Sequence, residues 1–112
     1  MLKVYSIRDI KSEGYGSLFT LLSEGLALRS FGEAALDPKT PFSRYPHDFQ
    51  LFELGTFEET TGRLESLKHP RYIASAAEAL TAIRPPAMIQ EESTKGEPVL
   101  TATGFEFNGG SN

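Results

Sequence analysis

The segment 49–67 constrains the fold most, because it alternates apolar and polar residues on both sides of a short polar turn, Glu-Thr-Thr-Gly. A period of two residues is typical of a β-strand, and the closing glycine, Gly62, can adopt the positive φ that tight hairpins need. The pattern predicts a β-hairpin whose returning strand is 63–67. Gly55 lies inside the first strand, where glycine often marks a bulge or a close approach of two backbones.

A further strand is predicted at the start of the chain. Residues 2–8 alternate with the same period and carry apolar side chains on both faces, so we expect a central strand rather than an edge. Residues 17–22 fit either a short strand or an irregular lead-in to the next element.

Residues 24–36 change to a helical period, with apolar residues three and four positions apart. Ser23 is a suitable N-cap, and Asp37 ends the helix because a residue that precedes proline avoids helical dihedral angles. Gly25 and Gly32 each weaken the helix by about 1 kcal/mol relative to alanine. The stripe expected to face a sheet consists of Ala27, Phe31, Ala34 and Ala35.

The connecting segments 37–48 and 68–75 are predicted to differ in conformation. Residues 37–48 contain three prolines and predict a loop, in which Phe42 and Tyr45 are expected to rest on the body of the protein. Residues 68–75 are predicted to be extended.

A second, short helix is predicted near residue 76. Ser75 and Glu78 match a capping box, which opens a helix that runs to about Ile83 before two prolines stop it. A helix that begins earlier, at Arg71, also places apolar residues on one face, so both starting points stay open.

Together these elements predict an α+β fold: a small antiparallel sheet with a central β-hairpin, one main helix packed on one face and a short second helix. The compact domain is expected to span 1–84. Residues 85–112 are rich in Pro, Gly, Ser and Glu and form a tail, in which 98–107 fits an added strand or a docking peptide. Because the second sheet face also carries Phe and Leu, we expect a homodimer or a higher assembly through the sheet.

Several classes of chemistry are disfavoured. The chain has no cysteine, which removes disulfides, thiolate metal sites and cysteine nucleophiles. The histidines, His47 and His69, lie beside prolines and lack the spacing of a metal site. The neighbouring carboxylates Glu58 and Glu59 are both expected to face water, whereas acid–base catalysis needs two carboxyl groups in different environments. We therefore expect no metal, no cofactor and no enzymatic activity.

Positive charge is combined with aromatic rings in two short segments, 44–47 and 68–72. Single-stranded nucleic acids are often bound in this way, with bases stacked on rings and phosphates close to Lys or Arg. The chain as a whole opposes this reading, because its net charge is −4. The alternative is that the tyrosines cap the core and the charges are solvated. The candidate nucleic-acid-binding residues are Arg44, Tyr45, Arg63, Lys68, Arg71 and Tyr72.

No window of the sequence has the length and apolar character of a signal peptide or of a membrane-spanning helix. We therefore expect no contact with a membrane and a location in the cytoplasm of the cell that makes the protein.

Two stretches resemble a known family. The start, "LKVYSIRD" (2–9), and the run "DPKTPFSRYPHDFQLFELGTFEETTG" (37–62) are similar to the small nonstructural protein of gokushovirus-type microviruses, which are single-stranded DNA phages. The resemblance covers roughly 1–83. The chain departs from the family pattern at Glu58, where the family often has Asp.

The resemblance implies a non-enzymatic phage protein in the cytoplasm of the host bacterium. It further implies a role in viral genome replication, or in the switch to single-stranded DNA synthesis, through binding of single-stranded DNA. The alternative function is a protein-interaction module that contacts a viral or host replication or assembly protein, which suits the acidic balance better.

Overall fold

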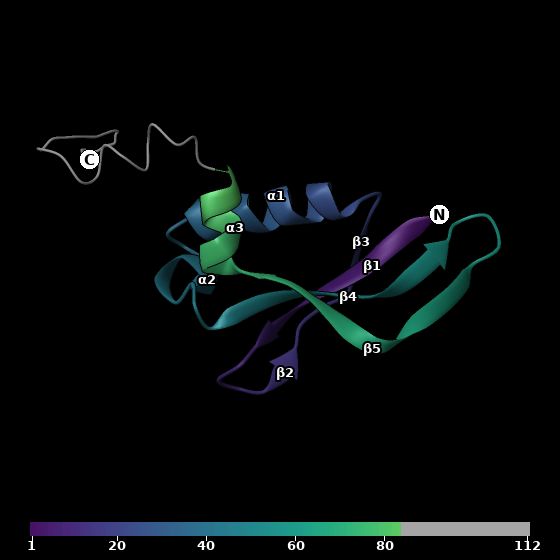
Figure 1. The fold of residues 1–112 in the computed structure, drawn as a ribbon, viewed down its shortest axis with the longest axis horizontal. Coiled ribbons are helices and arrows are strands. Elements are labelled where there is room, and N and C mark those ends of the chain that lie inside the picture. Colours follow the sequence, from purple (N-terminus) through teal and green to yellow (C-terminus); the bar gives the residue numbers. More distant parts are fainter. Residues whose placement is uncertain (84–112) are drawn as a thin grey trace, which may run out of the picture.

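The computed structural model describes residues 1–83 of the 112-residue chain, and the predicted tail with its strand at 98–107 lies outside the described residues. The fold is α+β, as predicted, and its sheet is antiparallel with strand order β2-β1-β4-β5, while β3 also pairs with β1 (Figure 1). The elements in chain order are β1 (Leu2–Asp9), β2 (Gly14–Tyr15), β3 (Phe19–Leu21), α1 (Glu24–Leu36), α2 (Pro41–Arg44), β4 (Phe49–Glu58), β5 (Arg63–Ser75) and α3 (Ala76–Ile83).

The predicted hairpin is formed by β4 and β5. Gly62 has a φ of 77°, and its N–H donates to the carbonyl of Glu58 at 2.8 Å, which closes the turn. The returning strand continues to Ser75 and includes the stretch predicted to be extended. A helix start at Arg71 is therefore excluded, because Arg71 pairs with Glu53 in the sheet.

A bulge interrupts the hairpin at Gly55, the position at which the sequence predicts a bulge or a close approach. Gly55 pairs with Ser66 and Glu53 pairs with Arg71, so residue 54 of β4 lies opposite residues 67–70 of β5. A Cβ atom at Gly55 would lie 2.0 Å from the carbonyl oxygen of Glu65. Only glycine allows the two backbones to lie this close.

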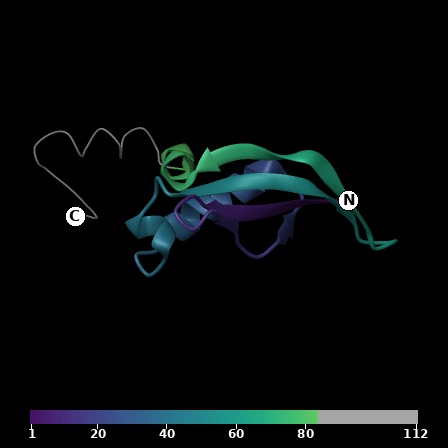
Figure 2. The ribbon, with the colours of Figure 1, turned by 90° about the horizontal axis from the view of Figure 1, so that it is seen from below.

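The core lies between α1 and one face of the sheet. Tyr5 of β1 and Leu51 of β4 are fully buried against Ala27 and Phe31 of α1. Figure 2 shows the face of the sheet that lies away from α1, with β5, β4 and β1 side by side and α1 behind them. Of the predicted apolar stripe of α1, Ala34 is only partly buried. We call the sheet face away from α1 the open face.

Gly32 has a packing role that the helical pattern did not indicate. It is buried on α1 where α3 crosses, and a Cβ atom there would lie 2.8 Å from the carbonyl oxygen of Ala79. The cost of glycine inside the helix is thus offset by the close packing of the two helices, which lie together in Figure 1.

The predicted helix caps are confirmed. The Oγ of Ser23 accepts a hydrogen bond from the N–H of Leu26 at 3.3 Å. At the start of α3, the N–H of Glu78 donates to Ser75 Oγ at 3.1 Å, and the N–H of Ser75 donates to Glu78 Oε1 at 2.9 Å, which completes the capping box.

The connection 37–48 contains the short helix α2, which the prolines did not predict. Thr40 caps it, and Pro41 occupies its first turn, where a missing N–H has no cost. Phe42 rests on the body as expected, between Phe31 and Phe49. The same expectation for Tyr45 is wrong, because its side chain is 56% exposed.

Candidate nucleic-acid interface

The six residues predicted to bind nucleic acid do not form one continuous patch. Arg44 and Tyr45 lie at the end of α2, whereas Arg63 begins β5 beside the hairpin turn, and Figure 1 shows α2 and this turn at opposite ends of the molecule. Lys68 lies in the bulged part of β5 and is exposed. Arg71 and Tyr72 are neighbours in a strand and therefore point to opposite faces of the sheet.

Arg71 points to the face that α1 covers, where two carboxylates hold it. Its Nη2 lies 2.6 Å from Glu53 Oε1 and 2.6 Å from Glu24 Oε1. The hydrogen bonds that Arg71 donates to Glu24, and then those to Glu53, raise the pKa of Arg71 above its already high ordinary value. The two carboxylates offset the positive charge of the guanidinium, so Arg71 attracts a phosphate only weakly.

Tyr72 lies on the open face in a row of three aromatic rings that crosses the sheet. Its ring packs edge-to-face on Phe52 of β4, with centroids 5.7 Å apart, and Phe52 packs in the same way on Tyr15 of β2 at 5.5 Å. Tyr15 is 44% exposed and Tyr72 is 45% exposed. We call Tyr15, Phe52 and Tyr72 the aromatic row.

The strand register explains why these three rings meet. Phe52 pairs with Ser6 on one side and with Tyr72 on the other, so Ser6, Phe52 and Tyr72 share the open face. Ser6 is small enough for rings from β2 and β4 to meet beside it, and it is fully buried. Its hydroxyl donates to the carbonyl of Gly16 at 2.9 Å, which fixes the chain that follows Tyr15.

Arg8 is the cation that the sheet places beside the aromatic row. It pairs with Tyr15 on one side and with Gln50 on the other, on the same face of β1 as Ser6. Within residues 1–83, no carboxylate lies within 4.0 Å of its guanidinium. Its charge is therefore available to a ligand on the open face.

Tyr72 is anchored at its hydroxyl. Its O–H donates to Glu78 Oε1 at 2.5 Å, so the capping box of α3 also fixes the ring. Burial, and then the hydrogen bond to Glu78, raise the pKa of Tyr72, while the same hydrogen bond lowers the pKa of Glu78. The ring is thus held in place before any ligand arrives, which reduces the entropy lost on binding.

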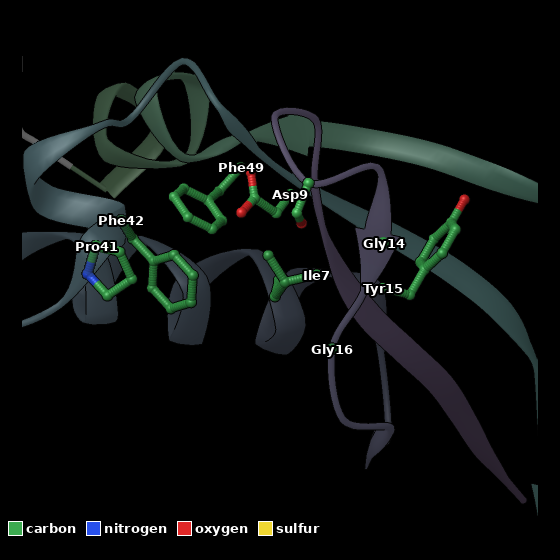
Figure 3. Close-up of a pocket in the computed structure, with 9 residues that line it drawn as sticks. Ile7, Asp9, Gly14, Tyr15, Gly16, Pro41, Phe42 and Phe49 are labelled. Carbon is green, nitrogen blue, oxygen red and sulfur yellow. The ribbon is translucent and has the colours of Figure 1, made fainter.

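A shallow apolar groove of about 370 Å³ lies at the junction of β1, β2 and α2. Ile7, Phe42 and Phe49 line it, with Asp9 at its edge (Figure 3). Figure 3 shows Tyr15 pointing away from these residues, on the far side of β2. The carboxylate makes this groove a poor site for a phosphate.

Metal ligands are not clustered in the part of the chain that the structure describes. No group of three or more His, Cys, Asp or Glu side chains is placed to hold a metal ion there, and His47 and His69 are both exposed.

Sequence reasoning missed Tyr15, Phe52 and Arg8. Tyr15 lies in a two-residue strand that is too short to show alternation and reads as part of a turn. Phe52 follows Leu51 in the alternating segment 49–67, so the two side chains point to opposite faces, and that alternation is a signal that could have identified the open face. Arg8 shares its face of β1 with Ser6, but the sheet order is needed to place either of them beside an aromatic ring.

Comparison with known families identifies the chain. The family model described as "Phage ORF5 protein" matches residues 2–79, which is well over half of the sequence. The chain belongs to the Phage ORF5 protein family. This confirms the resemblance to a phage protein. No curated protein and no solved structure matches this ORF5-family chain. None of the helices within residues 1–83 is long and apolar enough to cross a membrane.

Proposed function

We propose that this ORF5-family protein is a non-enzymatic, nonstructural protein of a gokushovirus-type microvirus that binds single-stranded DNA on the open face of its sheet. It acts in the host cytoplasm, in viral genome replication or in the switch to single-stranded DNA synthesis. The observation that carries the proposal is the aromatic row, Tyr15, Phe52 and Tyr72, with Arg8 beside it.

The chemistry of the open face suits unpaired bases. Every base has an apolar face that can stack on an exposed aromatic ring, and each such contact contributes about 1–3 kcal/mol without regard to sequence. Tyr15 and Tyr72 are the most exposed members of the row, and each presents a little under half of its surface to a ligand. A double helix keeps its bases stacked on one another and would not use these rings.

The acidic balance of the chain sets the strength and salt dependence of binding. A net charge of −4 repels phosphates at long range, so stacking has to supply most of the affinity. Arg8 and exposed cations of neighbouring segments, such as Lys68, can contact only a few phosphates. We therefore expect weak binding and a small salt slope, about −0.7 for each phosphate contacted.

The six residues that the sequence predicted to bind nucleic acid have different roles in this proposal. Tyr72 belongs to the aromatic row. Lys68, Arg44 and Arg63 lie outside it and remain candidates for peripheral contacts with a longer strand. Tyr45 also lies outside it and has no role in this proposal. Arg71 supports the fold from the other face of the sheet.

The proposal is tested by fluorescence anisotropy with a labelled single-stranded oligonucleotide of mixed sequence, over a salt series that starts at low ionic strength. Tyr15→Ala and Tyr72→Ala should each weaken binding by about 5- to 100-fold. Tyr45→Ala is the matched control, because Tyr45 is also exposed but lies outside the row, and it should bind like the wild type. Absence of binding at low salt, or an equal loss in the control, would overturn the proposal.

A second candidate function is a protein-interaction module that contacts a viral or host replication or assembly protein. It is favoured by the long outer strand β5, whose first ten residues are all exposed, and by the acidic net charge. An edge strand can accept an extended segment of a partner through its free backbone groups. Capture from infected cells should then recover a protein, and recovery of nucleic acid alone would argue against this function.

A further inference from the structure

The apolar groove at the junction of β1, β2 and α2 continues past Asp9 into a second hollow. The second hollow has a volume of about 400 Å³, against about 370 Å³ for the first, and the two share Asp9, Pro41 and Phe49 among their lining residues. Tyr45 and Asp48 line the second hollow as well. Because the two hollows adjoin, they form one continuous surface, which we call the acidic groove.

The floor of the acidic groove is apolar and is held in place by the fold. Phe42 packs edge-to-face on Phe49 with ring centroids 5.0 Å apart, and Ile7 lies close to them (Figure 3). All three side chains are only partly buried, so each keeps some surface open to solvent. Asp9 pairs with Phe49 in the sheet, which places a carboxylate at the edge of this floor.

Two partly buried carboxylates, Asp9 and Asp48, border the floor. Asp9 Oδ1 accepts a hydrogen bond from the N–H of Lys11 at 3.0 Å. The backbone of Asp48 is fixed on both sides, because its N–H donates to the Tyr45 carbonyl and its carbonyl accepts from the Ile10 N–H, at 3.0 Å each. Within residues 1–83, no Lys, Arg or His side chain lies within 4.0 Å of either carboxylate. Both negative charges are therefore available to a ligand.

The charge of the acidic groove favours a cation. Lys11 lines the second hollow, but it is exposed and is not paired with Asp9 or Asp48, so two negative charges face one positive charge that can turn into solvent. The net charge of −4 adds a long-range attraction for a basic partner. A phosphate is repelled for the same reason.

We propose that the acidic groove binds an extended segment of a partner protein in which Lys or Arg stands beside an apolar side chain. The apolar side chain rests on Phe42 and Phe49, and the cation reaches Asp9 or Asp48. Such charge complementarity selects basic partners and rejects acidic ones. A small molecule suits the surface less well, because the groove is shallow and small-molecule sites bury about 70–90% of their ligand.

The acidic groove is separate from the aromatic row. Asp9 follows Arg8 in β1, so the two side chains point to opposite faces of the sheet. Figure 3 shows the ring of Tyr15 pointing away from Ile7 and Phe49. A protein segment in the groove therefore leaves the open face free, and the inference goes beyond the proposed DNA binding and does not depend on it.

The test is selection of the full chain against a library of short random peptides, followed by titration of the enriched peptides by fluorescence anisotropy. Enriched peptides should combine Lys or Arg with a neighbouring Leu, Ile, Phe or Met, and their binding should weaken as salt is added. Asp9→Asn combined with Asp48→Asn should weaken binding by at least about 3-fold. Glu33→Gln is the matched control, because Glu33 is exposed on α1 outside the groove, and it should bind like the wild type.

Three results would overturn the proposal: no enriched peptide, enriched peptides that are acidic or lack an apolar side chain, or a double variant that binds them as tightly as the wild type. Circular dichroism reports whether the double variant is folded. If it is not, Asp48→Asn alone replaces a side chain that makes no hydrogen bond within residues 1–83 and should still weaken binding by about 2- to 5-fold. Unchanged binding in this single variant would then contradict the proposal.

Discussion

Arg71 donates two hydrogen bonds to a single oxygen of Glu53, from Nη2 at 2.6 Å and from Nε at 3.1 Å. The Glu53 side chain is only 8% exposed, so its carboxylate depends on this partner. The same guanidinium reaches Glu24 at the start of α1. Arg71 thus joins β5, β4 and α1, which explains why a residue predicted to contact DNA is part of the folded framework.

Replacement of Arg71 by alanine should destabilise the protein by about 1–3 kcal/mol. Loss of one partner of a buried ion pair costs about 3–5 kcal/mol, but Arg71 itself is half exposed, so solvent screening reduces the effect. Chemical denaturation of the variant measures it. Arg29→Ala is the control, since Arg29 is exposed on α1 and should change the stability by less than about 0.5 kcal/mol. Equal stability of both variants would contradict a structural role for Arg71.

Sequence patterns were most informative where one local rule decided the structure. The period of residues 49–67 and the positive φ of Gly62 fixed the hairpin, and Ser23 and Ser75 marked the helix starts as caps. The assembled surface was harder to predict. The aromatic row joins Tyr15, in a strand of two residues, to partners more than thirty residues away. Only the sheet order brings them together.

The structural role of Arg71 could not be predicted for a similar reason. Its sequence neighbours, Lys68 and Tyr72, favour a basic patch, whereas its partners Glu24 and Glu53 come from other elements. At the bulge, four residues of β5 lie opposite one residue of β4, so the sequence does not give the register that places Arg71 beside Glu53.

Two glycines of α1 should respond in opposite ways to alanine. Gly32→Ala should destabilise the protein by about 1–3 kcal/mol, because the new Cβ would lie 2.8 Å from the Ala79 carbonyl oxygen, a distance that overpacks the contact with α3. Gly25→Ala has no atom nearer than 4.0 Å and should be neutral or stabilise by up to about 1 kcal/mol, since alanine favours the helix. Thermal unfolding compares the two. A stabilised Gly32→Ala would contradict the close helix contact.

The hydroxyl of Tyr5 is expected to contribute nothing to stability. It is buried and has no hydrogen-bond partner among the described residues, and burial, followed by the nearby Glu53, raises its pKa. Tyr5→Phe should therefore leave the free energy of unfolding unchanged or raise it by up to about 2 kcal/mol. A clear loss of stability in denaturation would show that the hydroxyl is bonded in solution.

Stability should fall in acid partly through Glu78. Hydrogen bonds from Tyr72 and from the Ser75 N–H lower the pKa of Glu78, so its contribution is present above the ordinary carboxyl pKa of about 4.3 and is lost as the pH falls below that value. Glu78→Gln keeps a capping-box side chain but removes the charge. The wild type should be more stable than this variant near neutral pH, and the difference should disappear in acid. A difference that does not change with pH would exclude this role.

The central claim is that unpaired bases stack on the aromatic row. Photo-crosslinking of the full chain to single-stranded DNA that contains 5-bromodeoxyuridine, followed by peptide mapping, tests it most directly. The account predicts crosslinks at Tyr15, Phe52 or Tyr72, and their loss in Tyr15→Ala combined with Tyr72→Ala. Crosslinks that fall instead on Tyr45 and the segment around α2, and that persist in the double variant, would contradict it.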